Sequence, residues 1–286
     1  MKIVKIHAGL GNQMFQYALV QALQKFGHKV KIDFSEFEVY NIHNGYELGR
    51  AFNIHMTHIT KMEQKLFYGR RQRIGYRLLR FLLNTNNAFY IEKPEFSFSE
   101  DTLKNQKHAY LSGYWQHHSY VDLVEDELRT NFIFSPTTGQ RNQELEAILQ
   151  NTPNTVSIHV RRGDYLQHPT LNGICDKAFY ERAIAHINSH IEGPIYVFFS
   201  NDIPWCKENF NFPNAIFVDW NTGENSFRDM QMMSLCHHHI ISNSSFSWWA
   251  AWLNTKSDKM VIAPTSWIKD EQADPKALLL PEFVKL

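Results

Sequence analysis

The chain has 286 residues, with 29 basic and 29 acidic side chains and a formal net charge of zero. This balance argues against a general nucleic-acid-binding protein, which carries a basic excess. The content of 43% hydrophobic and 20% charged residues is that of a globular protein, long enough for one large or two ordinary domains. No apolar stretch reaches transmembrane length, Met1–Ile6 is too short and charged for a signal peptide, and three widely spaced cysteines suit reduced thiols. We therefore expect a cytoplasmic protein.

The chain opens with a strand, a loop with two glycines and a helix. Residues 2–7 alternate between polar and apolar and predict the strand, residues 14–26 follow a helical pattern, and residues 29–34 predict a second strand. The intervening loop, 8–13, is of the kind that presents free helix amides to a ligand, with a simple tight turn as an equal alternative. The β-α-β order predicts an α/β domain with a parallel sheet.

Residues 61–80 are strongly basic, with Glu63 as the single acid and apolar residues at roughly helical spacing. The basic residues are Lys61, Lys65, Arg70, Arg71, Arg73, Arg77 and Arg80. A solvated helix face is the ordinary explanation of such a run. The alternative is peripheral contact with an anionic membrane, to which each basic residue contributes about 1 kcal/mol at most.

Residues 110–116 predict a strand that ends in Tyr114, Trp115 and Gln116, between a weaker strand at 88–91 and a helix at 120–129. Aromatic rings and an amide at a strand end suit a sugar, by stacking and by hydroxyl contacts. The alternative is a place in the core for at least one of the two aromatic rings.

The polar, proline-containing segment 135–154 predicts a linker, so we divide the chain into domains 1–150 and 151–286. The second half again alternates strands and helices. Strands are predicted at 155–160, 195–200, 216–218, 239–242 and 260–263, and helices near 178–190, around Trp205 and Cys206, and at 224–236 and 248–253. Two such halves predict two Rossmann-like domains facing one cleft.

The predicted strand 155–160 is followed directly by Arg161, Arg162, Gly163 and Asp164. These residues lie at the carboxyl end of the strand, where open α/β sheets bind ligands. Two adjacent guanidiniums indicate an anion with several oxygens, such as a phosphate. The alternative, an Arg–Asp pair that ties a surface loop, is less favoured in this strand context.

Ser244 and Ser245 lie where a strand turns into a helix, a place that suits either phosphate binding or helix capping. Asp229, on the preceding helix, is able to accept hydrogen bonds from guanine or to serve as a solvated or capping residue. No metal site is expected, because the consecutive residues His237–His239 cannot converge on one ion, and no two aspartates are two residues apart. A diphosphate would then be neutralised by arginine and backbone amides.

The segment His159–Asp164 resembles the H-x-R-R-x-D signature of the α-1,2, α-1,6 and protein O-fucosyltransferases. Residues 9–18 resemble the opening of the α-1,2-fucosyltransferase family, glycosyltransferase family 11. Segments 112–116, 199–206 and 242–249 fit that family in order and spacing, so the resemblance covers nearly the whole chain.

The resemblance implies a GT-B fold, with an acceptor-side first domain and a second domain that binds GDP-fucose. It implies inverting, metal-independent transfer of L-fucose from GDP-β-L-fucose to the 2-hydroxyl of a galactose in an oligosaccharide or surface glycan. The alternatives are another linkage, another nucleotide sugar, or a non-catalytic glycan- or nucleotide-binding protein. Neither a particular acceptor nor an oligomeric state is predicted.

Carried over by motif, the resemblance implies three groups of site residues. The catalytic group is Arg161, Asp164 and Asn12; the donor-binding group is Gly11, His159, Arg162, Asp229, Ser244 and Ser245; the acceptor-binding group is Tyr114, Trp115 and Gln116. The α-1,6 relatives use a glutamate shortly after the signature as base, but residues 166–169 contain no acid. Asp164 is the nearest acid, either as a base or, as we favour, as a partner that orients an arginine.

Overall fold

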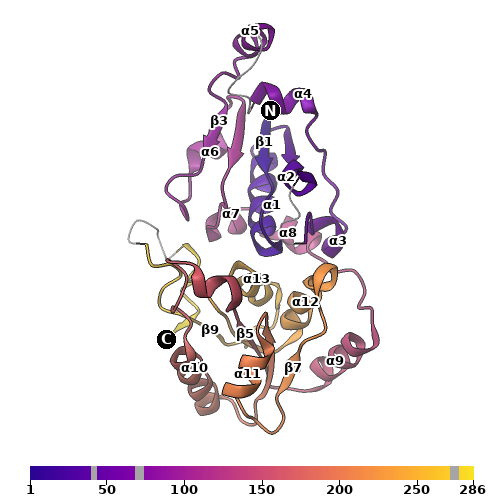
Figure 1. The fold of residues 1–286 in the computed structure, drawn as a ribbon, viewed down its shortest axis with the longest axis vertical. Helices are drawn as coiled ribbons and strands as arrows, with labels where there is room; N and C mark the ends of the chain where they lie inside the picture. The colour runs from indigo at the N-terminus through magenta and orange to yellow at the C-terminus, as the bar shows by residue number, and fades with distance from the viewer. Residues whose placement is uncertain (40–43, 68–73, 271–276) are drawn as a thin grey trace. The chain divides into compact units, whose positions relative to one another are not determined.

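The computed structural model describes residues 1–286 except 40–43, 68–73 and 271–276 (Figure 1). It divides into two compact units, Met1–Ile133 and Phe134–Leu286. Each unit is built on one parallel sheet with helices in the connections, as the strand-helix alternation predicts. Among the described helices, none is long and apolar enough to cross a membrane.

The first unit has a sheet of strand order β2-β1-β4-β3, in which all pairs are parallel. Its strands are β1 (Lys2–Lys5), β2 (Val30–Asp33), β3 (Phe89–Ile91) and β4 (Ala109–Ser112). Its described helices are α1 (Leu10–Lys25), α2 (Ser35–Val39), α3 (Leu48–Phe52), α4 (Lys61–Phe67), α5 (Ile74–Leu82), α6 (Glu100–Lys104), α7 (His118–Asp122) and α8 (Glu125–Asn131). Because β4 ends at Ser112, the strand predicted at 110–116 is too long, and residues 113–116 form the turn that follows it.

Helix α1 begins earlier than the apolar pattern suggests. Gly9 is its N-cap, with extended backbone, and its carbonyl accepts hydrogen bonds from the amides of Asn12 (3.0 Å) and Gln13 (3.1 Å). The loop therefore ends before Leu10. Ala8 rather than a glycine takes a left-handed backbone, with φ of 64°, a conformation that is uncommon for non-glycine residues.

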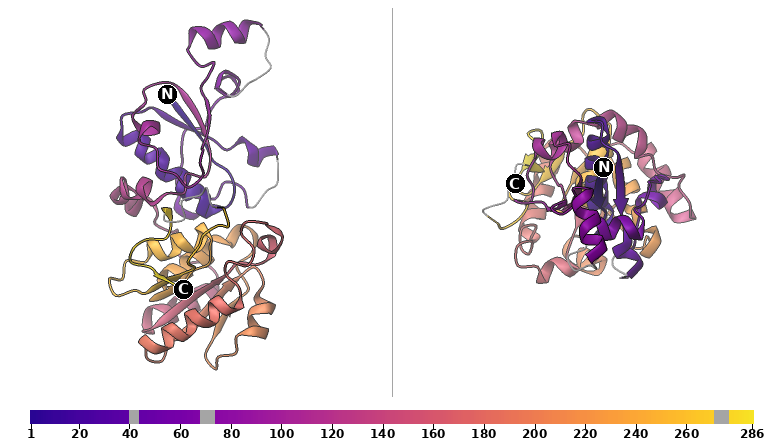
Figure 2. Two further views of the ribbon diagram at one scale, coloured as in Figure 1. Left: turned by 90° about the vertical axis from the view of Figure 1, so that its left-hand side faces the viewer. Right: turned by 90° about the horizontal axis from the view of Figure 1, so that it is seen from above.

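Helix α5 lies at the end of the first unit where the strands begin (Figures 1 and 2). Tyr76 and Leu79 pack from it against a cluster that contains Ile3, Leu66 and Tyr110. Leu78, Phe81 and Leu82 of the same helix are instead exposed.

The second unit has a sheet of strand order β10-β9-β8-β5-β6-β7, again parallel throughout. Its strands are β5 (Thr155–Val160), β6 (Ile195–Ser200), β7 (Ile216–Val218), β8 (His238–Ile240), β9 (Val261–Ala263) and β10 (Val284–Lys285). Its helices are α9 (Gln140–Asn151), η1 (Gly163–Gln167), α10 (Lys177–His190), α11 (Ile203–Asn209), η2 (Gly223–Asn225), α12 (Phe227–Leu235) and α13 (Ser245–Leu253).

Strand β5 lies between β8 and β6, and all six of its residues are buried. Val156, Ile158 and Val160 enter the hydrophobic core of this unit. A strand covered on both faces reads as a nearly continuous apolar run, which is why the sequence predicts its limits well.

The boundary between the units lies at residues 133 and 134, before the predicted division at 150. The segment 135–154 is part of the second unit, to which it is hydrogen-bonded, and is not a linker between two domains. Arg228 Nη1 donates to the Ser135 carbonyl (2.7 Å), and Asn142 Nδ2 donates to Asn221 Oδ1 (2.8 Å). These long-range contacts are not visible in local sequence composition.

Candidate functional site

The carboxyl edge of the second sheet carries Arg161 directly after β5. Its Nη2 lies 2.9 Å from the half-exposed Asp164 carboxylate, and its guanidinium lies 5.3 Å from the Tyr165 ring centroid. The Nε atom is buried, and among the described residues it has no hydrogen-bond partner. A buried donor without an acceptor costs free energy unless a ligand supplies one. Arg161 thus has a donor at the carboxyl edge of this sheet that is able to bind an anion.

Arg162 is engaged within the unit. Its Nε donates to Asp202 Oδ2 (3.0 Å), and its guanidinium stacks 4.1 Å from the Trp205 ring centroid. Its backbone amide donates to Asn201 Oδ1 (2.9 Å). Gly163 follows with φ of 32°, and a Cβ there would overlap the Asn201 side chain. These contacts favour a structural role, in which Arg162 joins the ends of β5 and β6.

His159 lies inside the protein, only 6% exposed. Its Nδ1 is 2.9 Å from Ser242 Oγ, and its ring is 5.7 Å from that of Phe246. Burial, with a smaller contribution from the Arg161 charge, lowers the pKa of His159 to about 3. The imidazole is therefore neutral at physiological pH and acts by hydrogen bonding rather than by charge.

Ser244 is the N-cap of α13, where its hydroxyl accepts from the Phe246 amide at 3.4 Å. Ser245 is the first residue of that helix and is half-buried. The capping alternative is thus present for Ser244. It is compatible with phosphate binding, because the start of a helix presents backbone amides and a positive dipole end to an anion.

Asp229 lies in the first turn of α12 and is half-buried. Its Oδ1 accepts a hydrogen bond from Asn221 Nδ2 (2.8 Å), and Asn142 in turn holds Asn221. Burial raises the pKa of Asp229 to about 7, although the bond from Asn221 acts in the opposite direction. A buried carboxylate with a single donor is well suited to accept further N–H groups from a ligand.

In the first unit, the start of α1 meets the turn after β4. Asn12 and Gly11 occupy the first turn of α1, and Gln116 is 7% exposed. Gln116 Nε2 donates to Asn12 Oδ1 at 2.5 Å. Gln13 Nε2 donates to the Ala8 carbonyl (2.8 Å), which fixes the entry into the helix. The structure thus brings the predicted residues Asn12 and Gln116 into direct contact.

The two aromatic residues of the turn differ in position. Tyr114 is half-buried, with its ring 5.0 Å from that of His7. Trp115 is 1% exposed, and its indole packs against Tyr90 (6.0 Å) and Tyr120 (6.2 Å). Trp115 therefore occupies the core, as the alternative interpretation holds for one of the pair, and Tyr114 is the ring that remains near the surface.

Two residues at this edge were not singled out from the sequence. His7 follows β1, and its Nε2 lies 3.1 Å from the Gly113 carbonyl. Glu92 follows β3, is 3% exposed, and accepts hydrogen bonds from the amides of Tyr114 and Trp115. The sequence signal is weak for both: His7 is the last residue of a predicted strand, and Glu92 is a polar residue directly after one.

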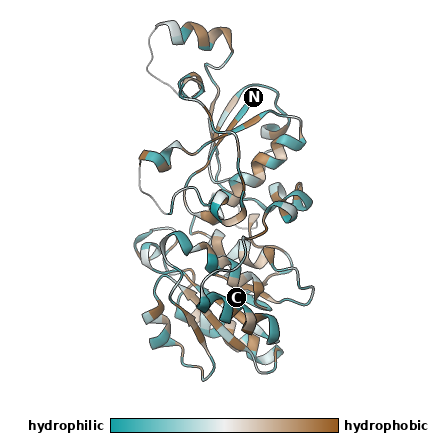
Figure 3. Cartoon of the chain, turned by 90° about the vertical axis from the view of Figure 1, so that its right-hand side faces the viewer, coloured by the Kyte–Doolittle hydropathy of each residue, from teal (hydrophilic) through white to brown (hydrophobic). Residues whose placement is uncertain are grey.

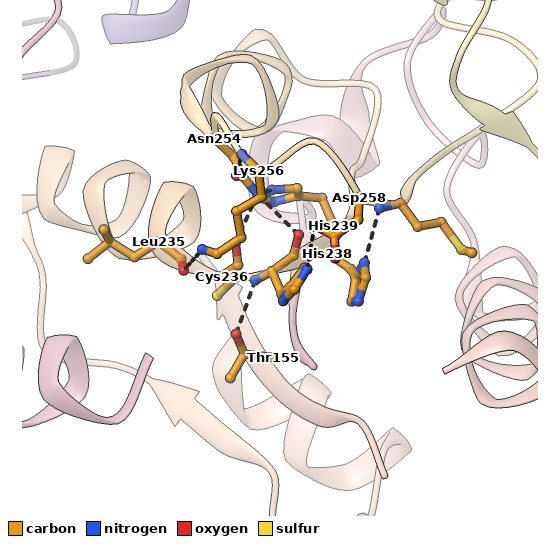
Figure 4. Close-up of polar contacts among 10 residues, drawn as sticks. Thr155, Leu235, Cys236, His238, His239, Asn254, Lys256 and Asp258 are labelled. Atoms are coloured by element: carbon orange, nitrogen blue, oxygen red, sulfur yellow. Dashed lines mark hydrogen bonds and ion pairs between the residues drawn. The ribbon is translucent and has the colours of Figure 1, made fainter. Parts of the chain in front are cut away.

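The three consecutive histidines have separate partners (Figure 4). His237 pairs with Asp258 at 2.9 Å, and His238 Nδ1 accepts from the Met260 amide at 3.0 Å. His239 lies 2.8 Å from Asn254 Nδ2. Within the ranges that the structure describes, no group of three or more His, Cys, Asp or Glu side chains is arranged to hold a metal ion.

Two successive units, each built on a parallel α/β sheet, have the architecture of the GT-B fold. The fucosyltransferase NodZ from Bradyrhizobium has a similar fold, with a TM-score of 0.54 at 13% identity over 88% of this chain and 91% of that one. The sequence profile described as Glycosyl transferase family 11 matches residues 1–286. The chain therefore belongs to glycosyl transferase family 11.

Two relatives from Escherichia coli match over almost the full length. The O-antigen biosynthesis glycosyltransferase WbnK is 33% identical over 285 residues, which cover 92% of this chain and 93% of the relative. An α-1,2-colitosyltransferase is 29% identical over 289 residues, which cover 94% and 93%. The family resemblance seen in the sequence is thereby confirmed.

Proposed function

We propose that this protein is an inverting α-1,2-fucosyltransferase that moves L-fucose from GDP-β-L-fucose to the 2-hydroxyl of a galactose. The observation that carries the proposal is the buried Nε of Arg161 after β5, which has no hydrogen-bond partner in the described part of a chain that belongs to family 11. The likeness to WbnK supports a surface-glycan acceptor such as an O-antigen unit.

In the proposed reaction, the bond between the acceptor oxygen and the anomeric carbon forms as the bond from that carbon to the diphosphate oxygen breaks. Arg161 would stabilise the negative charge that develops on the leaving GDP. Asp229 would accept from the N1 and N2 hydrogens of guanine, and the amides at the start of α13 would hold phosphate oxygens. The acceptor hydroxyl loses its proton to Asp164 or to solvent.

The remaining predicted roles stay proposals. Gly11, His159, Ser244 and Ser245 belong to the proposed donor site, and Arg162 would support it by joining the ends of β5 and β6. Tyr114 and Gln116 belong to the proposed acceptor site, with Trp115 supporting them from the core. No metal is proposed, because arginine and helix amides supply the charge compensation.

The deciding experiment incubates the full chain with GDP-fucose and an array of β-galactoside acceptors. GDP release is measured with and without acceptor, and the product linkage is determined by NMR. Acceptor-dependent GDP release with an α-1,2 product supports the proposal. GDP binding without transfer to any galactoside would instead favour a non-catalytic binding protein.

A second donor is favoured by the α-1,2-colitosyltransferase relative. Colitose lacks the 3-hydroxyl of L-fucose, so GDP-colitose and GDP-fucose differ by one hydrogen-bonding group. A site built to bind that hydroxyl discriminates strongly against a sugar that lacks it, whereas an apolar site discriminates weakly. The ratio of kcat/KM for the two donors, measured with the same acceptor, decides between them.

We also propose a peripheral membrane contact through residues 61–80 and the adjoining turn of α5. Leu78, Phe81 and Leu82 are 60%, 71% and 70% exposed. Their spacing places them on one side of α5, a helix in which Figure 3 shows both hydrophobic and hydrophilic residues. Arg77 is exposed on the same helix, and Lys61 is exposed at the start of α4. Arg70, Arg71 and Arg73 of the same predicted segment lie outside the described residues.

An apolar face bordered by basic side chains is complementary to an anionic lipid surface. Such a contact would place the protein at the cytoplasmic face of the membrane, close to lipid-linked acceptors. The test is co-sedimentation with vesicles of phosphatidylglycerol or of phosphatidylcholine. Binding should require the anionic lipid, weaken with salt, and be lost in Phe81→Glu but kept in the control Ile133→Glu. Equal sedimentation with both lipids would contradict the contact.

A further inference from the structure

Glu92 connects two strand ends at the carboxyl edge of the first sheet. It follows β3 directly and is 3% exposed. Its Oε2 accepts hydrogen bonds from the backbone amides of Tyr114 (2.7 Å) and Trp115 (2.9 Å), in the turn after β4. Backbone amides that converge on a carboxylate make strong, charge-assisted hydrogen bonds.

The turn is shaped around this carboxylate. A Cβ at Gly113 would overlap both Cβ and Oε2 of Glu92, so the backbone passes directly against the glutamate. Trp115 adopts φ of 57°, a left-handed conformation that is unfavourable for a bulky residue and persists only where its surroundings enforce it. The next residue, Gln116, donates to Asn12 at 2.5 Å. The position of Gln116 therefore depends on a turn that Glu92 holds.

The electrostatic surroundings of Glu92 are unfavourable to its charge. Burial, with a smaller contribution from Glu95 on the same loop, raises the pKa of Glu92 to about 7, although hydrogen bonds from the backbone of Trp115, Tyr114 and Phe96 act in the opposite direction. Tyr114 from the turn and Tyr120 from α7 face the same carboxylate. None of the ion pairs found among the described residues includes Glu92. A charge kept here without a counter-ion is costly for the fold, which is a reason to seek a role for it in function.

We propose that Glu92 is a positioning residue for the acceptor site: its ionised carboxylate holds the turn 113–116 and thereby fixes the Gln116 amide against Asn12. Protonation replaces a carboxylate that accepts two N–H bonds by a weaker acceptor and loosens the turn. The role in acceptor binding rests on the proposed function, whereas the coupling between Glu92 and the turn does not.

The coupling is tested without any substrate. The ¹⁵N and amide ¹H resonances of Tyr114 and Trp115 are followed from pH 5 to pH 9 in the uniformly labelled full chain. Both amides should shift with one common midpoint in the wild type and stay flat in Glu92→Gln. The matched control, Glu95→Gln, removes a neighbouring charge and should move the midpoint to lower pH without abolishing it. Amide chemical shifts of Tyr114 and Trp115 that do not change with pH in the wild type would overturn the proposal.

The acceptor role is tested by kinetics. In the wild type at saturating GDP-fucose, kcat/KM for the acceptor should rise with pH through the same midpoint. The pH dependence of the KM for GDP-fucose should be the same in the wild type and in Glu92→Gln. Glu92→Gln should flatten that profile and raise the acceptor KM at least fivefold relative to Glu95→Gln. Equal effects on donor and acceptor KM, or an unchanged profile, would refute a positioning role. A wild type without transferase activity would refute the proposed function, and the amide titration would still decide whether Glu92 controls the turn.

Discussion

Gln116 donates its side-chain amide to Asn12, and this 2.5 Å contact joins the turn after β4 to the first turn of α1. Both residues were assigned to the site from separate motifs, one near the start of the chain and one in its middle. Their contact means that two predicted groups act as one unit at the carboxyl edge of the first sheet.

A double-mutant cycle tests whether this contact matters for activity. Asn12→Ala and Gln116→Ala should each raise the acceptor KM, and their effects should be non-additive by about 0.5–3 kcal/mol, as for residues in direct contact. Acceptor kcat/KM is measured for the two single variants and the double variant. Strictly additive effects would show that the two side chains act independently.

Arg161 should be required for turnover. Arg161→Ala should lower kcat by roughly 10²-fold or more, because the charge on the leaving diphosphate loses its stabilising donor. Arg161→Lys should restore little, since an ammonium lacks the planar fork and the Nε donor. The exposed Arg182 on α10 offers a control, Arg182→Ala, which should retain full activity. Near-normal turnover in Arg161→Ala would remove this residue from the mechanism.

Asp164 should orient Arg161 rather than act as the base, because its carboxylate lies 2.9 Å from Arg161 Nη2. Asp164→Asn should therefore weaken GDP-fucose binding and leave the shape of the kcat–pH profile unchanged. Donor affinity and the pH profile are measured in parallel. An intact GDP dissociation constant with kcat reduced by about 10²-fold at every pH would support the base role instead.

Asp229 should make GDP affinity depend on pH. Its pKa is raised to about 7 in the free protein, and guanine N–H donors favour the ionised form, so GDP should bind more tightly as pH rises through about 7. Asp229→Ala should weaken binding by about 1–3 kcal/mol, because buried guanine donors lose their acceptor. Calorimetry between pH 6 and pH 8.5 checks both effects. A dissociation constant that is unchanged in the variant would leave Asp229 with a structural role.

Activity should persist in excess EDTA. The proposed charge compensation comes from Arg161 and the helix amides, so removal of divalent ions should change kcat less than twofold. Initial rates are compared with EDTA alone and after addition of Mg²⁺ or Mn²⁺. Strict dependence on either ion would contradict the proposed mechanism.

The sequence predicts most of the second sheet closely. The limits of β5, β6 and β7 agree with the structure because each is a short apolar run between polar residues. The first two are also largely buried, which makes their apolar runs nearly continuous. Helices were less well delimited: the helix expected at 120–129 is divided into α7 and α8. The two-residue strand β10 has no pattern of its own and exists only through its pairing with β9.

Only part of the site was predicted, because the sequence displays local motifs but not contacts between distant residues. Arg161 and Asn12 belong to local motifs that the sequence displays. Glu92 does not belong to a local motif, because its partners are the backbone amides of residues that lie 22 and 23 positions further along the chain. The sequence indicates a core position for at least one of Tyr114 and Trp115 but does not indicate which one, since aromatic composition does not distinguish a ring that binds sugar from one that fills a core.

The order of strands in the second sheet has a consequence for how the protein is made. Strand β5 pairs with β6, which follows soon after it, but also with β8, and the sheet is completed by Val284 and Lys285. Pairings between strands distant in sequence form slowly, and parallel strands are prone to aggregate until their partner strands have been made. The first unit has all its strands before residue 113 and can fold while the rest is still being synthesised. Overproduction at reduced temperature, or with chaperones that hold incomplete sheets, should therefore improve the soluble yield chiefly by protecting the unfinished second unit.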